Sequence, residues 1–402
     1  MEVGIPSASP KPYSKLSHIA RFHSWLPLYA DYEAISSLTM DISYEEASIG
    51  ATAFFQNDLG TSSGSVGYSL HKDPYNNKKW KNSLHGKITY TGLYPVIEAS
   101  VDVNSRSVLR YHYNETLTGK DKDQFNSAIP LGGNSLSGSL SAYVPMNFSK
   151  GGVLRGLVPK VSLGLSNDKY DTGVIRRDRP VSIISPSKVS FFSGYTPGEL
   201  TGLGSVTLSL RGYSMLARAD SETYPRYGIG AEAGYVGRLT LGNLFSPEIY
   251  TYVYGYLPGF AEAQGWKLTA RTRHYTYSEA AFKENRIDIC PRGINANLPG
   301  NNFFRVTADY ALPLYFGDIS ALSPIAYINH FLMIPHFDLT GFGRGFLFTL
   351  GCDFSVELSN LLWFPFDGSV GFSVDLNGGS YFKEIKETND RLSFGLIFSM
   401  DI

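Results

Sequence analysis

The sequence predicts an all-β protein, a closed antiparallel transmembrane β-barrel of about 16 strands with long outer loops and short periplasmic turns. Apolar and polar residues alternate along strand-length segments, which gives each segment an apolar and a polar face. No stretch approaches the roughly 20 apolar residues of a membrane helix. The 402 residues include 27 Tyr, 25 Phe and 41 Gly but only 18% charged residues. This composition favours a barrel, the other structure that satisfies its own backbone in lipid.

The C-terminal part of the chain alternates most clearly. Segment 302–316 places Phe304, Val306, Ala308, Tyr310, Leu312, Leu314 and Phe316 on one face and Arg305, Thr307 and Asp309 on the other. Segments 346–358, 366–376 and 392–402 repeat the pattern. Their lengths suit the ~9–11 residues that cross a membrane at a tilt. We expect lipid contact for Phe304, Tyr310, Leu350, Phe372, Phe394 and Phe398, and none for Asp353, Asp375 and Arg391.

Ten further segments read as strands: 50–57, 65–71, 84–93, 96–104, 136–146, 157–165, 206–213, 227–236, 248–257 and 266–275. The last five strands begin at or contain Phe303, Ile325, Phe346, Phe366 and Leu392. Short connections at 58–64, 94–95, 148–155, 258–264 and 317–322 alternate with long ones at 105–134, 166–202, 276–301 and 377–390. Single-chain bacterial barrels have an even strand number, so we assign 38–44 as a sixteenth strand.

Residues 1–36 read as a linker and an aromatic lead-in, and residues 37–402 as the barrel. No signal-peptide pattern opens the chain, and the Pro/Ser-rich segment 5–13 is typical of a linker. We therefore expect a longer protein of which this is the C-terminal part. Segment 15–32 is aromatic and basic without a clean period. It is either a lead-in that packs at the periplasmic mouth or an ordered surface segment.

One motif stands at the end of a long loop. Cys290-Pro291-Arg292-Gly293-Ile294 precedes a strand that ends in Asp309-Tyr310-Ala311-Leu312-Pro313-Leu314. This pair resembles the Omp85 superfamily, in which a loop carrying (V/P)RG(F/Y) precedes a twelfth strand ending like EYRFPL. Phe337-Asp338 resembles the family's inward aspartate motif, and the last strand resembles its assembly signal. The resemblance covers residues 264–402, and it departs from the family at Ile294 and Asp309.

The resemblance implies a barrel of sixteen strands whose sixth loop folds into the lumen, where Arg292 of the Pro291-Arg292-Gly293 motif lies against Asp338. By parity Asp309, Asp353 and Glu357 are further lumen carboxylates. A bidentate carboxylate would stabilise a lumen arginine, whereas an unpaired one would be costly. The alternative is an ordinary exposed loop arginine. Segment 22–29 (FHSWLPLY) and the turn 92–95 also resemble a branch in which the barrel follows a TolB-like β-propeller.

Other constellations predict no chemistry. His330 and His336 lie about 20 Å apart if both are on one strand, so we interpret them as separate lumen or rim residues. Cys352 shares parity with Leu350 and should face lipid, while Cys290 lies in a loop, which disfavours a disulfide. No serine elbow of a hydrolase is present. We expect no catalytic residues, metal or cofactor, and no enzyme.

Two functional classes stay open. In the first, this is the outer-membrane module of an Omp85-like protein that inserts or translocates polypeptides, or the membrane anchor of a larger surface complex. In the second, it is a passive, porin-like pore for small solutes. The first implies the bacterial outer membrane, its lipid, and other outer-membrane or periplasmic proteins as partners. A net charge of −1 gives no reason to expect nucleic acid.

Overall fold

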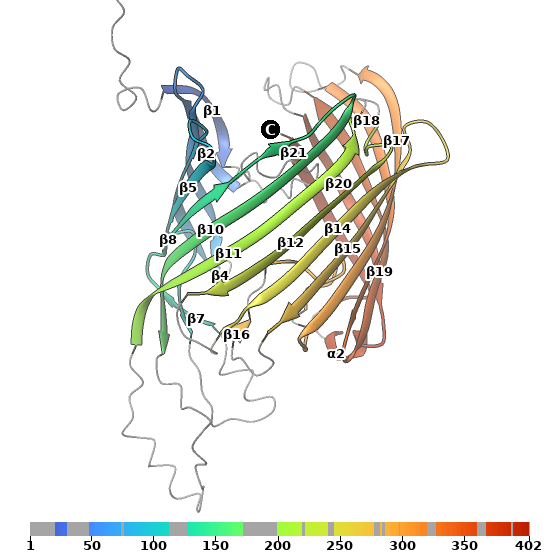
Figure 1. Cartoon of the computed structure of the whole chain (residues 1–402). Coiled ribbons are helices and arrows are strands. Elements are labelled where there is room, and N and C mark those ends of the chain that lie inside the picture. Colours follow the sequence, from blue (N-terminus) through green and yellow to red (C-terminus); the bar gives the residue numbers. More distant parts are fainter. Residues whose placement is uncertain are drawn as a thin grey trace, which may run out of the picture.

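The structure is a computed structural model that is almost entirely β-strand (Figure 1). It describes residues 21–29, 48–73, 76–111, 128–171, 199–218, 222–239, 245–276, 282–283, 286–296, 298–319, 327–359, 367–386 and 389–401. The described helix, α2, covers only Phe382–Ile385. Among the described residues, no helix is long and apolar enough to cross a membrane.

Most strands are long. They are β1 (Arg21–Tyr29), β2 (Ser48–Gln56), β3 (Ser62–Asp73), β4 (Asn76–Tyr90), β5 (Val96–Val103), β6 (Val108–Tyr111), β7 (Ala128–Gly132), β8 (Leu136–Tyr143), β9 (Met146–Asn147), β10 (Val153–Asp171), β11 (Glu199–Leu216), β12 (Gly228–Arg238), β13 (Phe245–Ser246), β14 (Glu248–Pro258), β15 (Gly265–Tyr275), β16 (Phe282–Lys283), β17 (Asn302–Ile319), β18 (Tyr327–Phe342), β19 (Gly345–Ser359), β20 (Asp367–Gly378) and β21 (Leu392–Asp401).

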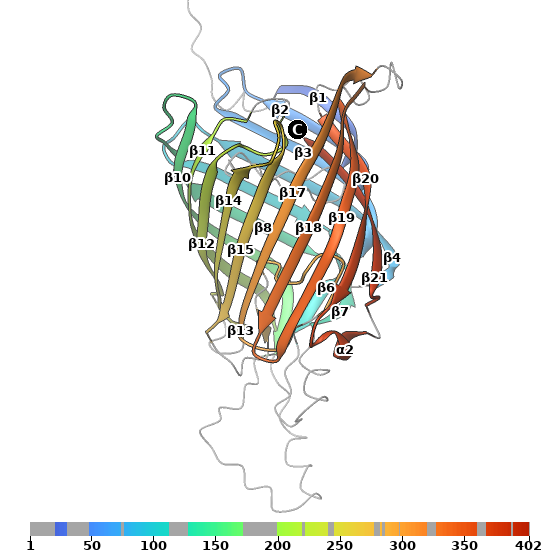
Figure 2. The same ribbon diagram turned by 90° about the vertical axis from the view of Figure 1, so that its right-hand side faces the viewer.

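Nineteen of these strands form one sheet, and β13 and β16 pair separately. The long strands pair antiparallel with their neighbours in sequence, in the order β1-β2-β3-β4-β5-β8-β10-β11-β12-β14-β15-β17-β18-β19-β20-β21. The short strand β6 lies outside this series and pairs in parallel with β10. Figures 1 and 2 show that the sheet is strongly curved.

The two faces of the sheet differ in the way that alternation predicts. Phe304, Leu350, Phe372 and Phe394 lie on the exposed face, and Leu396 beside them is 94% exposed. The opposite face is polar yet buried; it includes Arg305, Thr307, Asp309, His336, Asp338, Thr340, Thr349, Ser355, Asp375 and Asn377.

The other predictions of which face a side chain occupies have different outcomes. Asp353 is half-buried and lies opposite Ser373 on β20. Tyr310 is half-buried: its ring contacts Trp266, with centroids 4.5 Å apart, and its hydroxyl donates to Gln264 Oε1 at 2.5 Å. Arg391 is exposed, just before β21. The side chain of Phe398 lies outside the described residues.

Each predicted strand segment within the described residues overlaps a strand of the sheet, with bounds that differ in places: 84–93 runs past the end of β4, and 136–146 covers β8 and the start of β9. β10 and β11 extend well beyond the predicted 157–165 and 206–213. The predicted alternation of short and long connections has two exceptions. The connections between β3 and β4 and between β18 and β19 are two residues each, although they lie at the end of the sheet where we expected long loops. The predicted strand 38–44 lies outside the described residues.

The N-terminal strand of the sheet is β1, within the segment that we expected to be a lead-in. It pairs with β2, with Trp25 opposite Ala53. The register shifts between Phe22 and Ser24 and again between Leu26 and Leu28. Each shift reverses the side-chain alternation, which explains why this segment shows no period in the sequence.

Candidate functional site

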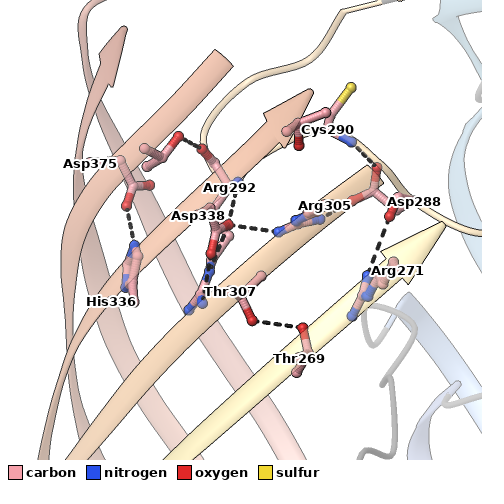
Figure 3. A network of polar contacts seen from close by, with 12 residues as sticks. Thr269, Arg271, Asp288, Cys290, Arg292, Arg305, Thr307, His336, Asp338 and Asp375 are labelled. Atoms are coloured by element: carbon pink, nitrogen blue, oxygen red, sulfur yellow. Dashed lines mark hydrogen bonds and ion pairs between the residues drawn. The ribbon is translucent and has the colours of Figure 1, made fainter. Parts of the chain in front are cut away.

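The segment 286–296 crosses the polar face of the sheet and is fixed there by its backbone (Figure 3). The backbone N–H groups of Arg286 and Ile287 donate to the Glu248 carboxylate at 2.6 and 3.1 Å. Further along, Thr340 Oγ1 donates to the Ile289 carbonyl at 2.6 Å. Side chains of β14 and β18 thus take over the hydrogen bonds that a loop backbone would otherwise make with water.

Arg292 is the centre of the site. Its Nε and Nη2 donate to Asp338 Oδ2 and Oδ1, each at 3.2 Å, as a planar fork. Its Nη2 also donates to Asp309, and its Nη1 reaches Asp353 at 3.5 Å. Burial alone would lower the pKa of Arg292, but the carboxylates of Asp309 and Asp338 offset this and raise it. The arginine is therefore charged and held by three strands, β17, β18 and β19.

Asp338 is fully buried and serves two arginines. In addition to the Arg292 side chain, it accepts the Arg292 backbone N–H at 2.9 Å and Arg305 Nη2 at 2.7 Å. Arg305 in turn reaches Asp288 of the loop at 3.1 Å. Without the loop, Asp338 would keep the donor from Arg305 of β17 but lose the charge-assisted donors of Arg292.

The backbone of the motif is held as closely as its side chain. Thr349 Oγ1 donates to the Arg292 carbonyl at 2.7 Å, and Asn377 Nδ2 donates to the Gly293 carbonyl at 3.3 Å. Gly293 has φ +71°, in the left-handed region. A Cβ there would lie 2.4 Å from Ser393 Oγ and 3.0 Å from Asp375 Oδ2. Both conformation and space therefore require glycine at this position.

We expect Gly293→Ala to destabilise the folded protein by about 1–2 kcal/mol from the left-handed backbone alone, with the steric contact in addition. The measurement is the free energy of unfolding in urea. Adding Ser393→Gly removes the nearest atom but not the backbone cost, so the double variant should recover only part of the loss. Full stability of Gly293→Ala would contradict the docked loop.

Apolar contacts hold the loop on either side of the arginine. Ile294 is buried with Leu347 and Phe382, and Ile289 with Tyr275 and Phe303. Ile294 stands where the resemblance leads us to expect an aromatic residue, and it fills this apolar cluster as a branched aliphatic side chain. Beyond Ile294, the Asn295 backbone N–H donates to Asn389 Oδ1 at 2.8 Å.

A buried histidine joins the same network. His336 is 2% exposed; its Nε2 lies 2.9 Å from Asp375 Oδ1 and its Nδ1 lies 3.7 Å from Asp353 Oδ1. From the sequence we expected His336 in the lumen or at its rim, but we predicted no contact with Asp375 or Asp353. Its connection to Arg292 through Asp353 depends on the register of β18, β19 and β20.

The structure brings most of the predicted site residues together. Arg292 meets Asp338, Asp309 and Asp353, whereas Glu357 lies on β19 about 13 Å beyond Asp353 by the strand rise and is not among the described partners of Arg292. The roles of Arg305, Thr349 and Asn377 were not predicted. The alternation of the sequence places these three residues on the polar face, but their hydrogen-bond partners depend on how neighbouring strands are aligned.

The other residues that the sequence analysis considered are two cysteines and a histidine. Cys290 and Cys352 are free thiols. The side chain of His330 lies outside the described residues. Among the described residues, no group of His, Cys, Asp and Glu is arranged to hold a metal ion.

A comparison with known protein families finds none that matches this chain, and a comparison with curated proteins finds no similar protein. The resemblance to the Omp85 superfamily therefore stays a prediction from the motif residues of the sequence.

Proposed function

We propose that the sheet closes into a sixteen-stranded barrel that spans the bacterial outer membrane. The main series of antiparallel pairings, from β1 to β21, contains sixteen long strands, the even number typical of single-chain barrels. In Figures 1 and 2 the C-terminus, at the end of β21, lies close to β1. Closure would remove the two edges that an open sheet leaves unpaired.

The exposed apolar face supports a position in lipid. Phe304, Leu350, Phe372, Phe394 and Leu396 come from four strands and are each about half or more exposed. Water-soluble monomers rarely expose a continuous apolar surface of more than a few hundred Å². The buried polar face then corresponds to the lumen.

We propose further that the barrel belongs with the Omp85-like proteins and that segment 286–296 is its infolded sixth loop. The observation that carries this proposal is the position of Arg292, which forms ion pairs with Asp309, Asp338 and Asp353 on three adjacent strands. The functional consequence is a role in inserting or translocating polypeptides at the outer membrane, or in anchoring a larger surface complex. Its partners are outer-membrane lipid and other outer-membrane or periplasmic proteins.

A conductance measurement separates this proposal from a passive pore. In planar bilayers the intact protein should give low conductance, because the loop occupies the lumen. Deleting residues 288–297 should raise the conductance, while a deletion of equal length within 172–198 serves as the control. Large, steady openings of the intact protein would favour the porin-like alternative.

The role itself is tested by its partners. In cells that make the full-length protein, crosslinking followed by mass spectrometry should recover outer-membrane or periplasmic proteins attached to it. Unfinished outer-membrane proteins among them would support insertion or translocation, and a fixed set of folded subunits would support the anchor. Recovery of no protein partner would overturn both.

A further inference from the structure

Five turns at one end of the sheet expose large apolar or aromatic side chains. They connect β2 to β3, β4 to β5, β8 to β10, β11 to β12 and β14 to β15, and they lie along one rim because neighbouring strands are antiparallel. We call them the turn rim. Their exposed residues are Leu59, Tyr94, Phe148, Tyr227 and Phe260, at 58, 71, 59, 55 and 88%. Turns that lie in water are usually built from small and polar residues, so water does not explain this rim.

The connections at the opposite end of the sheet bury most of their described aromatic and large apolar residues. Phe245 is 4% exposed and packs on Tyr111, with ring centroids 5.0 Å apart. Ile294 and Phe382 pack together and are 6 and 5% exposed. Leu239, at 57%, is an exception. The two ends therefore differ, because the connections at the far end cover their apolar residues themselves and the turn rim does not.

Phe260 shows to which side the rim is directed. Its ring lies 5.8 Å from the ring of Tyr310, and its backbone N–H donates to the Tyr310 hydroxyl at 3.1 Å. Trp266 lies opposite Tyr310 in the β15–β17 register, with ring centroids 4.5 Å apart. Tyr310 has the same parity as the exposed Phe304, so it belongs to the apolar face of the sheet and not to the polar one. The apolar face thus continues onto the turn.

Three cations accompany the apolar residues of two neighbouring turns. Lys150 lies in the turn before β10, Arg155 near the start of β10 and Arg218 in the turn after β11, and all three are exposed. The two turns are joined by the Ala217 N–H, which donates to the Gly152 carbonyl at 2.9 Å. Among the described residues no carboxylate pairs with these cations, and the two guanidinium groups donate to a serine hydroxyl and to a backbone carbonyl. The rim therefore offers positive charge next to apolar surface.

Arg155 marks the end of the apolar face on β10. It shares its parity with Val161, Leu163 and Leu165, which are 47, 45 and 68% exposed further along the strand. A guanidinium among such residues would be costly in hydrocarbon. At the end of a strand, however, a long side chain can lay its methylene groups on apolar surface and place its charge in a polar layer. The position of Arg155 thus fits the boundary between hydrocarbon and headgroups.

We propose that the turn rim lies within the headgroup layer of a phospholipid leaflet, with its apolar residues at the boundary to the acyl chains and Lys150, Arg155 and Arg218 at the lipid phosphates. This placement rests on the proposed membrane-spanning barrel. Aromatic side chains favour that depth in a membrane, and cations near the surface are attracted to anionic lipids. A protein domain that covered the rim would have to supply a carboxylate for each of the three cations, whereas lipid phosphates surround the whole rim.

Tryptophan fluorescence measures this depth. In a parent whose four tryptophans are replaced by phenylalanine, Phe260→Trp or Phe148→Trp places one fluorophore on the rim, and Phe372→Trp places one on the apolar face of β20. In vesicles of phosphatidylcholine and phosphatidylglycerol, lipids brominated near the headgroup should quench the rim tryptophans most, and aqueous iodide should quench them far less than free tryptophan. Lipids brominated near the chain end should quench the Phe372→Trp variant most.

The control on β20 separates two failures. Rim tryptophans that iodide quenches as strongly as free tryptophan, or that neither iodide nor brominated lipid quenches, would overturn the placement of the rim. If brominated lipid still quenches the Phe372→Trp variant, the barrel remains in the membrane. If it does not, the membrane-spanning barrel is wrong as well.

The cations give a second measurement that needs no removal of tryptophan. Urea unfolding is compared in vesicles with and without phosphatidylglycerol. The increase that the anionic lipid gives to the ratio of folded to unfolded protein should shrink by up to roughly fivefold for each of Lys150→Gln, Arg155→Gln and Arg218→Gln. Arg21→Gln with Asp58→Asn removes an ion pair from the same rim without changing the net charge, so it should behave as the parent. An equal response to anionic lipid in the triple variant and in the parent would overturn the proposed contact with phosphates.

Discussion

Replacing Asp338 by alanine should give one of the largest losses of stability of any single substitution in the protein. Asp338 is fully buried and accepts from the backbone and side chain of Arg292 and from Arg305. Its removal leaves two guanidinium groups without a shared carboxylate. We expect a loss of roughly 3–5 kcal/mol in the free energy of unfolding, the range for breaking a buried ion pair.

Arg292→Ala should cost less, because the Arg292 side chain is 29% exposed and solvent can reach the carboxylates it leaves behind. Three acidic groups, Asp309, Asp338 and Asp353, then lie together without this cation. In the double variant Arg292→Ala/Asp338→Ala the two losses should not add, and the coupling should be about 0.5–3 kcal/mol. Arg292→Lys should rescue poorly, since an ammonium cannot contact all three strands as the planar fork does.

Arg21 and Asp58 supply the control for this cycle. They form an ion pair at 3.3 Å in which the side chains are 79% and 44% exposed, and exposed pairs contribute about 0–1 kcal/mol. The same cycle on this pair should show little coupling. Strict additivity at Arg292 and Asp338 would show that the loop is not held by this ion pair. A cysteine at position 292 that reacts with an impermeant reagent as fast as one within 105–134 would argue the same way.

Alternation predicted the strands because a strand with one face outward repeats every two residues, and most of the sheet follows this rule without interruption. β1 was missed for the same physical reason. Its register shifts around His23 and Pro27 reverse the alternation twice in nine residues. Where the register of a strand shifts, the alternation of residues no longer indicates which face a side chain occupies. β1 can then be recognised only from its pairing with β2.

Two signals in the sequence predicted the site: the alternation of polar and apolar residues, and the motif around Arg292. Parity placed Asp309 and Asp353 on the polar face, and the motif resemblance paired Arg292 with Asp338. The role of Arg305 depends on the register of β17 and β18, in which Thr307 lies opposite Asp338. A shift of that register by two residues would keep every face prediction intact and move Arg305 away from its carboxylate. Sequence alone carries no signal for that choice.

Phe372→Arg should be the second substitution with a large effect, if the exposed face lies in hydrocarbon. Phe372 is 51% exposed near the middle of β20 and stacks on Phe354, with ring centroids 5.2 Å apart. A charge at mid-membrane on the lipid face of a barrel costs about 2–4 kcal/mol. Phe372→Ala loses the ring contact without adding charge, so the difference between the two variants isolates the cost of the charge.

Ser373→Lys supplies the control on the other face. Ser373 is the next residue of β20, opposite Asp353 in the β19–β20 register and two residues from Asp375, so a cation there meets carboxylates and should be tolerated. Urea unfolding in lipid bilayers should therefore rank Phe372→Arg well below both Phe372→Ala and Ser373→Lys. In water the order would differ, because an exposed arginine costs nothing there and a large exposed phenylalanine gains nothing. Equal stability of Phe372→Arg and Phe372→Ala would mean that the apolar face does not meet lipid, and the membrane-spanning barrel would then be wrong even though the sheet itself stands.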